Sequence, residues 1–146
     1  MPASVPEYPA GEMPGQQQAV LAEGLYLANL LLAPGLAFLI LLILYRRSRA
    51  TAPPLAAAHL RQTLVASLWA GGLLVIVNGL ILLLGGYQGA STWTLVILYF
   101  TLAHSSLVML GILGLAKALA GQCFRFPLVG PPLPAGCGSL ARPIGS

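Results

Sequence analysis

The chain has no aspartate, and its three glutamates all precede the first long apolar run. Charged residues make up only 7% of the 146 residues, whereas a soluble domain carries roughly 25%. Hydrolysis by a pair of carboxylates, or by a metal that carboxylates hold, therefore has almost no residues to work with. We expect no enzymatic activity from this chain acting alone.

Cysteine and histidine are also scarce, with two of each. Cys123 and Cys137 do not form a C-x-x-C pair, and a zinc site needs more ligands at closer spacing. We expect two free thiols and no metal. The first 24 residues lack lysine and arginine, so the basic segment that opens a signal peptide is missing. The basic residues that give the net charge of +4 do not form a stripe along the chain, so no nucleic-acid partner is expected.

Three long apolar runs dominate the sequence. They are Leu25–Tyr45, Leu64–Leu84 and Trp93–Leu115. Each has at least 21 residues and no Asp, Glu, Lys or Arg, and a hydrocarbon core about 30 Å thick needs about 20 helical residues. Because backbone groups in lipid must be paired within the segment, the runs are predicted to be helices. The sequence thus predicts an all-α, integral membrane bundle of three transmembrane helices with Pro/Gly-rich extended termini.

The predicted organisation has three parts. These are an extended outer segment over residues 1–18, a transmembrane domain over 19–122 with spans at about 25–45, 62–85 and 92–119, and a Pro-rich tail over 123–146. Pro34 and Gly35 fall inside the first span, where proline removes a backbone hydrogen bond and predicts a kink. The two extensions are expected to be ordered only against a partner.

The basic residues predict an orientation in the membrane. Between the first two runs lie Arg46, Arg47, Arg49 and Arg61, whereas residues 85–91 carry no charge and the segment before the first run carries the acids. The positive-inside rule then places the N-terminus outside, and the first loop and the tail in the cytoplasm. We expect a multi-pass protein of a bacterial inner membrane.

His104 is the polar residue of greatest interest in the apolar runs. An ionisable side chain at such a position usually faces protein or a cavity. Three roles stay open: a neutral imidazole bonded to a neighbouring helix, for example to Asn78; a proton relay; or an axial ligand to a haem or chlorin. The first is favoured, so no cofactor is expected. His59 lies at the far end of its span and cannot supply a second ligand at the same level.

Other residues are predicted to serve packing or partner contact. Asn78 is expected to hold helices together, and Gly114 and Ala118 form a small-xxx-small pair that permits close approach. His59 and Gln62 lie about one turn apart on one helix face. Arg125 sits between two aromatic residues, a pattern suited to the headgroup level of a bilayer. We expect its Phe-Arg-Phe-Pro turn to pack back onto the His59–Gln62 face.

Two short motifs support a resemblance to a known family. They are Ala58-His59-Leu60-Arg61-Gln62-Thr63-Leu64 and the segment from Lys117 to Gly130, KALAGQCFRFPLVG. Together with three spans, they resemble a family of small bacterial membrane proteins of unknown function. That family is similar to the twenty-kilodalton component of the chloroplast inner-envelope import machinery. The resemblance covers roughly residues 26 to 130. Family members often carry an asparagine shortly after the glutamine, where this chain has Thr63-Leu64-Val65, and acidic residues in the first loop, where it has Ala and Pro.

Three classes of function remain after these exclusions. The favoured one is a non-catalytic accessory, assembly or stabilising subunit of a larger inner-membrane complex, respiratory or photosynthetic in kind, with the lipid bilayer and other membrane subunits as partners. The second is an oligomeric translocation or transport component, because three helices alone make a poor pore. The third is a cofactor-binding subunit that uses His104.

Overall fold

A computed structural model describes residues 11–137, and all regular secondary structure in this part of the chain is helical, with no β-strand. The elements are α1 (Gln16–Leu31), α2 (Leu36–Ser48), α3 (Pro54–Gly71), the π-helical segment η1 (Gly72–Val77), α4 (Asn78–Gly85) and α5 (Ala90–Leu119). Because α3, η1 and α4 follow one another without a break, the chain forms four helical rods. The predicted all-α class is confirmed.

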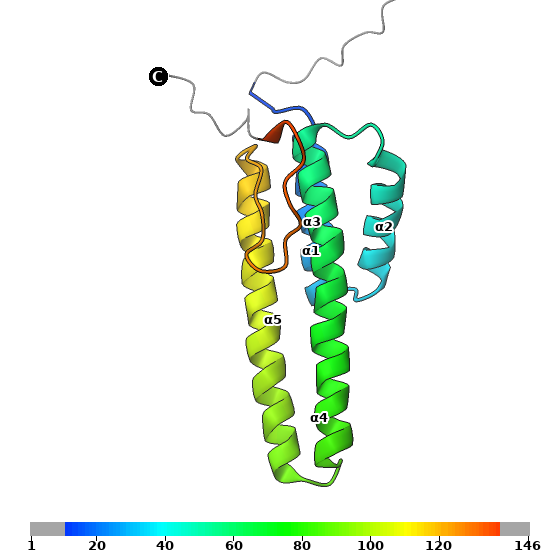
Figure 1. Ribbon diagram of the computed structural model, residues 1–146, viewed down its shortest axis with the longest axis vertical. Helices are drawn as coiled ribbons and strands as arrows, with labels where there is room; N and C mark the ends of the chain where they lie inside the picture. The colour runs from blue at the N-terminus through cyan, green and yellow to red at the C-terminus, as the bar shows by residue number, and fades with distance from the viewer. Residues whose placement is uncertain (1–10, 138–146) are drawn as a thin grey trace, which may run out of the picture.

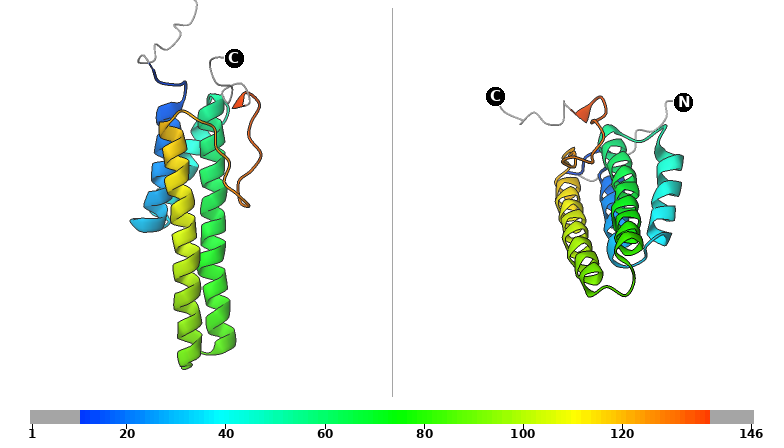
Figure 2. Two further views of the ribbon diagram at one scale, coloured as in Figure 1. Left: turned by 90° about the vertical axis from the view of Figure 1, so that its left-hand side faces the viewer. Right: turned by 60° about the horizontal axis from the view of Figure 1, so that its bottom comes forward.

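The rods form a short hairpin packed against one part of a long hairpin (Figure 1). The long hairpin consists of α3–η1–α4 and α5. In the short hairpin, α1 packs against both α3 and α5, while α2 packs against α1 and α3. We call the end at which the described chain begins and finishes the terminal end, and the end formed by residues 86–89 the turn end. The short hairpin starts and finishes at the terminal end and reaches only part of the way toward the turn end (Figure 2).

The predicted first span is wrong, because Leu25–Tyr45 is not one helix. At Pro34-Gly35 the chain reverses, whereas the sequence predicted only a kink. Pro34 supplies no N–H, and Gly35 adopts φ 85°, a left-handed conformation that few other residues accept. The Asn29 side chain stabilises the turn by accepting the Gly35 N–H at 2.9 Å. These local features turn one apolar run into two antiparallel helices.

Within residues 11–137, two helices and not three are long and apolar enough to cross a membrane. Pro54–Gly85 has 32 residues and a mean hydropathy of 2.2, and Ala90–Leu119 has 30 residues and a mean hydropathy of 2.0, each over its most apolar window. Only 6% and 11% of those windows are buried, unlike the core helix of a soluble protein. Long apolar helices with exposed apolar faces favour a membrane protein.

All charged residues in the described part of the chain belong to segments of the terminal half. They are Glu12, Glu23, Arg46, Arg47, Arg49, Arg61, Lys117 and Arg125. Because α2 runs back to the end at which α1 begins, the described N-terminal segment and the arginine-rich loop lie at the same end. The predicted orientation had placed these two segments on opposite sides of a membrane, whereas the fold places residues 11–15 and the first loop at one end of the bundle.

The core lies where α1 packs between the two long helices. It contains Tyr26, Leu30, Ala66, Ala70, Leu107 and Phe126. Glycine lets α5 approach α1 closely, since a Cβ at Gly111 would lie 2.8 Å from the Tyr26 ring. Ala118 is fully buried in a smaller cluster with Ala19 and Leu55. Part of the tail also joins the core through Phe126, so these tail residues are ordered against the chain itself and not only against a partner.

Candidate functional site

The centre of polar chemistry is a buried contact between Glu23 of α1 and His59 of α3. Glu23 Oε1 lies 2.6 Å from His59 Nδ1, and neither side chain is exposed to solvent. The two residues are 36 positions apart in the sequence. Burying an acid and an imidazole is costly unless each finds a partner. Their pairing stabilises the position of α1 against α3.

The second nitrogen of His59 determines how protons are held in this pair. Nε2 lies 3.0 Å from the backbone carbonyl oxygen of Gln122, which can only accept, so Nε2 carries a hydrogen. Nδ1 then has two options: it accepts a hydrogen from a protonated Glu23, or it donates one to a Glu23 carboxylate as part of an imidazolium. Either way, exactly one proton lies between Glu23 and His59, and the pair is neutral overall.

Gln62 completes the cluster and connects it to the tail. Its carbonyl oxygen accepts the backbone N–H of Phe126 at 2.7 Å, which leaves its amide NH₂ to donate to Glu23 Oε1 at 3.2 Å. Gln62 is 2% exposed and Phe126 is fully buried. The expected packing of the Phe-Arg-Phe-Pro turn against the His59–Gln62 face is thus seen in the structure. We refer to Glu23, His59 and Gln62 as the polar cluster.

The surroundings of Glu23 favour its protonated form. Burial raises the pKa of the Glu23 carboxyl above its ordinary value, while the hydrogen bond and charge of His59 and the hydrogen bond from Gln62 act in the opposite direction. Glu23 Oε2 faces Gly114 of α5 and has no hydrogen-bond partner in the described part of the chain. Because the polar cluster is closed to solvent, it can hold a proton but offers no open face to a substrate.

The tail is tied down next to the polar cluster by a disulfide between Cys123 and Cys137, whose Cα atoms are 5.9 Å apart. The expectation of two free thiols is therefore wrong. Spacing along the sequence could not reveal the pairing, because the intervening prolines and glycines bend the tail back on itself. Arg125, expected at the headgroup level, donates from Nε to the carbonyl oxygen of Gly130 at 2.9 Å within this loop.

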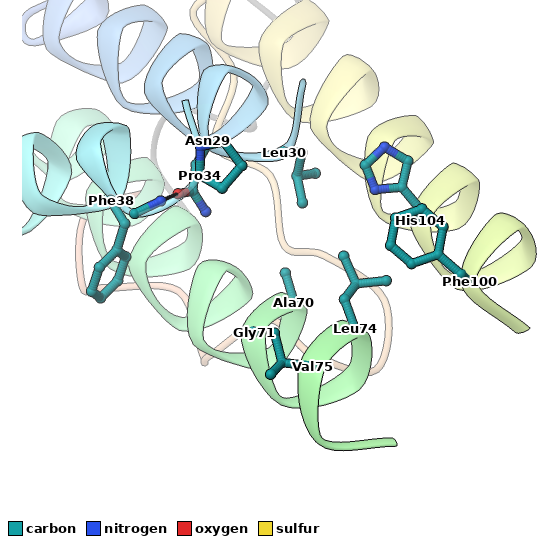
Figure 3. A pocket seen from close by; sticks show the side chains of 11 residues that line it. Asn29, Leu30, Pro34, Phe38, Ala70, Gly71, Leu74, Val75, Phe100 and His104 are labelled. Atoms are coloured by element: carbon teal, nitrogen blue, oxygen red, sulfur yellow. Dashed lines mark hydrogen bonds between the residues drawn. The ribbon is translucent and has the colours of Figure 1, made fainter. Parts of the chain in front are cut away.

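A second site lies at the turn of the short hairpin, around Pro34-Gly35. Here a pocket of about 410 Å³ is bounded by the hairpin turn, by the junction of α3 with η1, and by α5 (Figure 3). Its walls are mostly apolar, with Phe38 and Leu74 among the lining residues. His104 lines the pocket and stacks on Phe100, with ring centroids 5.3 Å apart and planes 10° apart. The volume falls within the roughly 300–1,000 Å³ typical of ligand pockets.

His104 makes no bond to Asn78. Its Nδ1 is buried and has no hydrogen-bond partner in the described residues. Asn78 instead donates to the Leu74 carbonyl oxygen of its own helix at 2.6 Å. The Tyr99 hydroxyl of α5 donates to the carbonyl oxygen of Leu73 in η1 at 3.1 Å. The expectation that Asn78 bonds a neighbouring helix is wrong, because the π-helical turn before it leaves a carbonyl group within reach.

The sequence identified four packing residues: His59, Gln62, Gly114 and Ala118. It did not identify Glu23, which contacts the first three of them. Glu23 was counted only among the acids that precede the first apolar run, yet it is the fully buried centre of the polar cluster. One signal was available: Glu23 is the only charged residue between Gln16 and Tyr45. An isolated acid in such a helix requires a partner, and His59 was one of two histidines to consider.

Comparison of the chain with protein-family models, with curated protein sequences and with solved structures finds no match in any of the three.

Proposed function

We propose that the protein is a non-catalytic subunit embedded in a bacterial inner membrane, where it assembles or stabilises a larger membrane complex. In this proposal α3–η1–α4 and α5 cross the bilayer, and the short hairpin enters it from the terminal end without crossing. The terminal end faces the cytoplasm, because the basic residues gather there and the turn end carries no charge.

The observation that carries the proposal is the uncovered half of the long hairpin. Beyond the reach of the short hairpin, α4 packs against α5 and against no other rod of the described chain. Large apolar side chains there are open, among them Leu80 at 49% exposure and Leu83 at 82%. A Cβ at Gly72 or Gly79, seven residues apart, would meet nothing within 4 Å. Small residues on an uncovered helix face allow a neighbouring helix to approach closely.

The polar cluster supports a structural role as well. Its hydrogen bonds join α1, α3 and the tail to one another, and its side chains are closed to solvent. Such a cluster fits a framework that presents a surface to a partner.

Site-specific cross-linking tests the proposal. A photoreactive amino acid at Ile76, which is 61% exposed, should give one discrete adduct with another membrane protein. The same adduct should be reduced at least about fivefold by Gly79→Leu, which blocks close approach of a partner and whose Cβ meets nothing within 4 Å. A cross-linker at Leu39 on α2, 52% exposed, is the matched control. Adducts with lipid alone at Ile76, or a yield unaffected by Gly79→Leu, would contradict the proposal.

A second candidate function, that of a transport component, is favoured by the pocket at the turn of the short hairpin. His104, whose Nδ1 has no hydrogen-bond partner among the described residues, adds an ionisable side chain to the apolar walls. Vesicles reconstituted with the purified protein test this candidate by solute or proton flux, with His104→Phe as the blocked variant. An absorbance spectrum of the same sample tests the third class, a haem or chlorin on His104.

A further inference from the structure

A smaller pocket lies at the terminal end, between the end of α2, the first turns of α3 and the tail. Its volume is about 130 Å³. Its lining includes Arg49, which directly follows α2, Arg61 of α3, and Tyr45 of α2. One further wall is formed by residues 131–134 of the tail, three of which are prolines and have no N–H to offer.

The polar side chains of this pocket suit an anion. Arg49 and Arg61 are donors only, and the Tyr45 hydroxyl can also donate. Gln62 borders the pocket, but its amide is already engaged by Glu23 and by the Phe126 N–H. Within residues 11–137 the one ion pair joins Glu23 to His59. Neither arginine of the pocket therefore has an acidic partner in the described chain.

The size of the pocket limits which anions it can hold. Ligand sites for drug-sized molecules occupy roughly 300–1,000 Å³, more than twice the volume found here. A phosphate with its ester oxygens is a better match. Two guanidinium groups recognise phosphate well because their paired N–H groups match its oxygens.

Apolar faces continue from the pocket toward the turn end. On α2, the spacing of four, three and four residues places one set of side chains on a single face: Phe38, Leu42, Tyr45 and Arg49. On α3 the same spacing places a matching set on one face: Ala57, Arg61, Leu64 and Leu68. Each face has an arginine toward the terminal end and apolar residues beyond it, and Leu68 is 61% exposed. A ligand with a phosphate head and an apolar tail fits this order.

We propose that this pocket binds the phosphate of an anionic phospholipid, with an acyl chain lying along the adjoining faces of α2 and α3. The proposal rests on the membrane placement above but not on a protein partner. Arg49 and Arg61 hold the phosphate, and Tyr45 adds a hydroxyl contact. The lipid then joins α2, α3 and the tail at the point where the short hairpin meets the long one.

Thermal unfolding of the full chain, purified in a mild non-ionic detergent and stripped of lipid, tests the proposal. Three probes are added separately: phosphatidylglycerol, phosphatidylcholine and inorganic phosphate. A ligand that binds only the folded protein raises its Tm as its concentration rises. Phosphatidylglycerol should raise the Tm, and raising the salt concentration should weaken this effect. Phosphatidylcholine and inorganic phosphate should leave the Tm unchanged at equal concentration.

Two charge-matched double variants locate the site. Arg49→Gln with Arg61→Gln should weaken phosphatidylglycerol binding at least about tenfold, because it removes two charge-assisted contacts. Arg46→Gln with Arg47→Gln removes two charges from the same helix end outside the pocket, and should change binding less than about threefold. If the first double variant is not monodisperse, each single variant replaces it, with a smaller loss in the same direction.

Three results would overturn the proposal. They are a Tm that phosphatidylglycerol does not raise, equal loss in the two double variants, and an equal Tm shift from inorganic phosphate alone. The last would assign the pocket to a free anion and not to a lipid. Cross-linking at Ile76 is independent of all three, so a failed lipid site and a failed assembly role can be told apart.

Discussion

Gly114 of α5 lies directly against the carboxyl group of Glu23 in α1. A Cβ at position 114 would stand 2.6 Å from the carboxyl carbon of Glu23, closer than real contacts allow. The glycine thus leaves the space that the acid occupies. Because Glu23 is held from the other side by His59, it cannot move away without breaking the polar cluster.

Gly114→Ala should therefore destabilise the protein. Overpacking of a buried site costs typically about 1–3 kcal/mol, and here it also disturbs the Glu23–His59 contact. Thermal or denaturant unfolding in detergent measures the change. Gly79→Ala is the matched control, since its Cβ would meet nothing and alanine favours a helix by up to about 1 kcal/mol over glycine. Equal stability of the two variants would contradict the packing described for Gly114.

Breaking the polar cluster from one side should cost more than removing both partners. Glu23→Leu or His59→Leu alone leaves a buried polar group without its partner, at a cost of about 3–5 kcal/mol. The double variant should lose less than the sum of the single losses. A double-mutant cycle on the free energy of unfolding measures this coupling. Strict additivity would mean that the 2.6 Å contact contributes no stability.

Glu23→Gln should be milder than Glu23→Leu, because its amide can donate to Nδ1 while Nε2 still donates to the Gln122 carbonyl oxygen. The comparison also predicts a pH dependence. Since the pKa of Glu23 is raised in the folded protein, the native state keeps a proton that the unfolded state releases. The stability of the wild type relative to Glu23→Gln should then fall as pH rises above the ordinary glutamate value of 4.5.

The expected slope in that pH range approaches about 1.4 kcal/mol per pH unit, one proton's worth. Parallel unfolding curves of the two proteins at several pH values measure it. A difference that rises with pH would mean that the Glu23 pKa is lowered by folding and not raised.

His104→Leu should be tolerated. The buried Nδ1 has no partner in the described chain, and a buried polar atom without a hydrogen bond costs about 1–3 kcal/mol that leucine does not incur. Loss of the stacking on Phe100 offsets part of that gain. We expect the Tm to stay within a few degrees of the wild type. A loss as large as that of Gly114→Ala would show that His104 is bonded in the protein as it exists in the membrane.

The orientation can be tested with cysteine labelling in intact bacterial cells. A reporter, Gln88→Cys at the turn end in a chain carrying Cys123→Ala and Cys137→Ala, should react with a membrane-impermeant maleimide from outside. The native cysteines, after mild reduction, should react only once the cells are permeabilised. The opposite pattern would place the terminal end outside, the orientation that the Cys123–Cys137 disulfide favours, because such bonds persist in oxidising compartments.

The two long helices follow from the amino-acid sequence alone. Their apolar runs exceed the length of a bilayer crossing and contain no charge, so no context could turn them into a loop. The same reasoning failed for the first run. Hydropathy reports only the composition of a segment, so it does not show whether the chain reverses within it. An apolar run that reverses at Pro34-Gly35 has the same composition as one that continues. The reversal is stabilised locally by the Asn29–Gly35 hydrogen bond and globally by the packing of α1 between α3 and α5.

The polar cluster shows the same limit from the side of chemistry. Composition and depth in the sequence marked His59 and Gln62 as residues in need of partners, and burial made a partner obligatory. Which residue would supply it depended on the hairpin that carries Glu23 back beside α3, on the space left by Gly114, and on the tail that brings Gln122 and Phe126 alongside. These contacts join positions far apart in the chain, so only the tertiary structure could decide them.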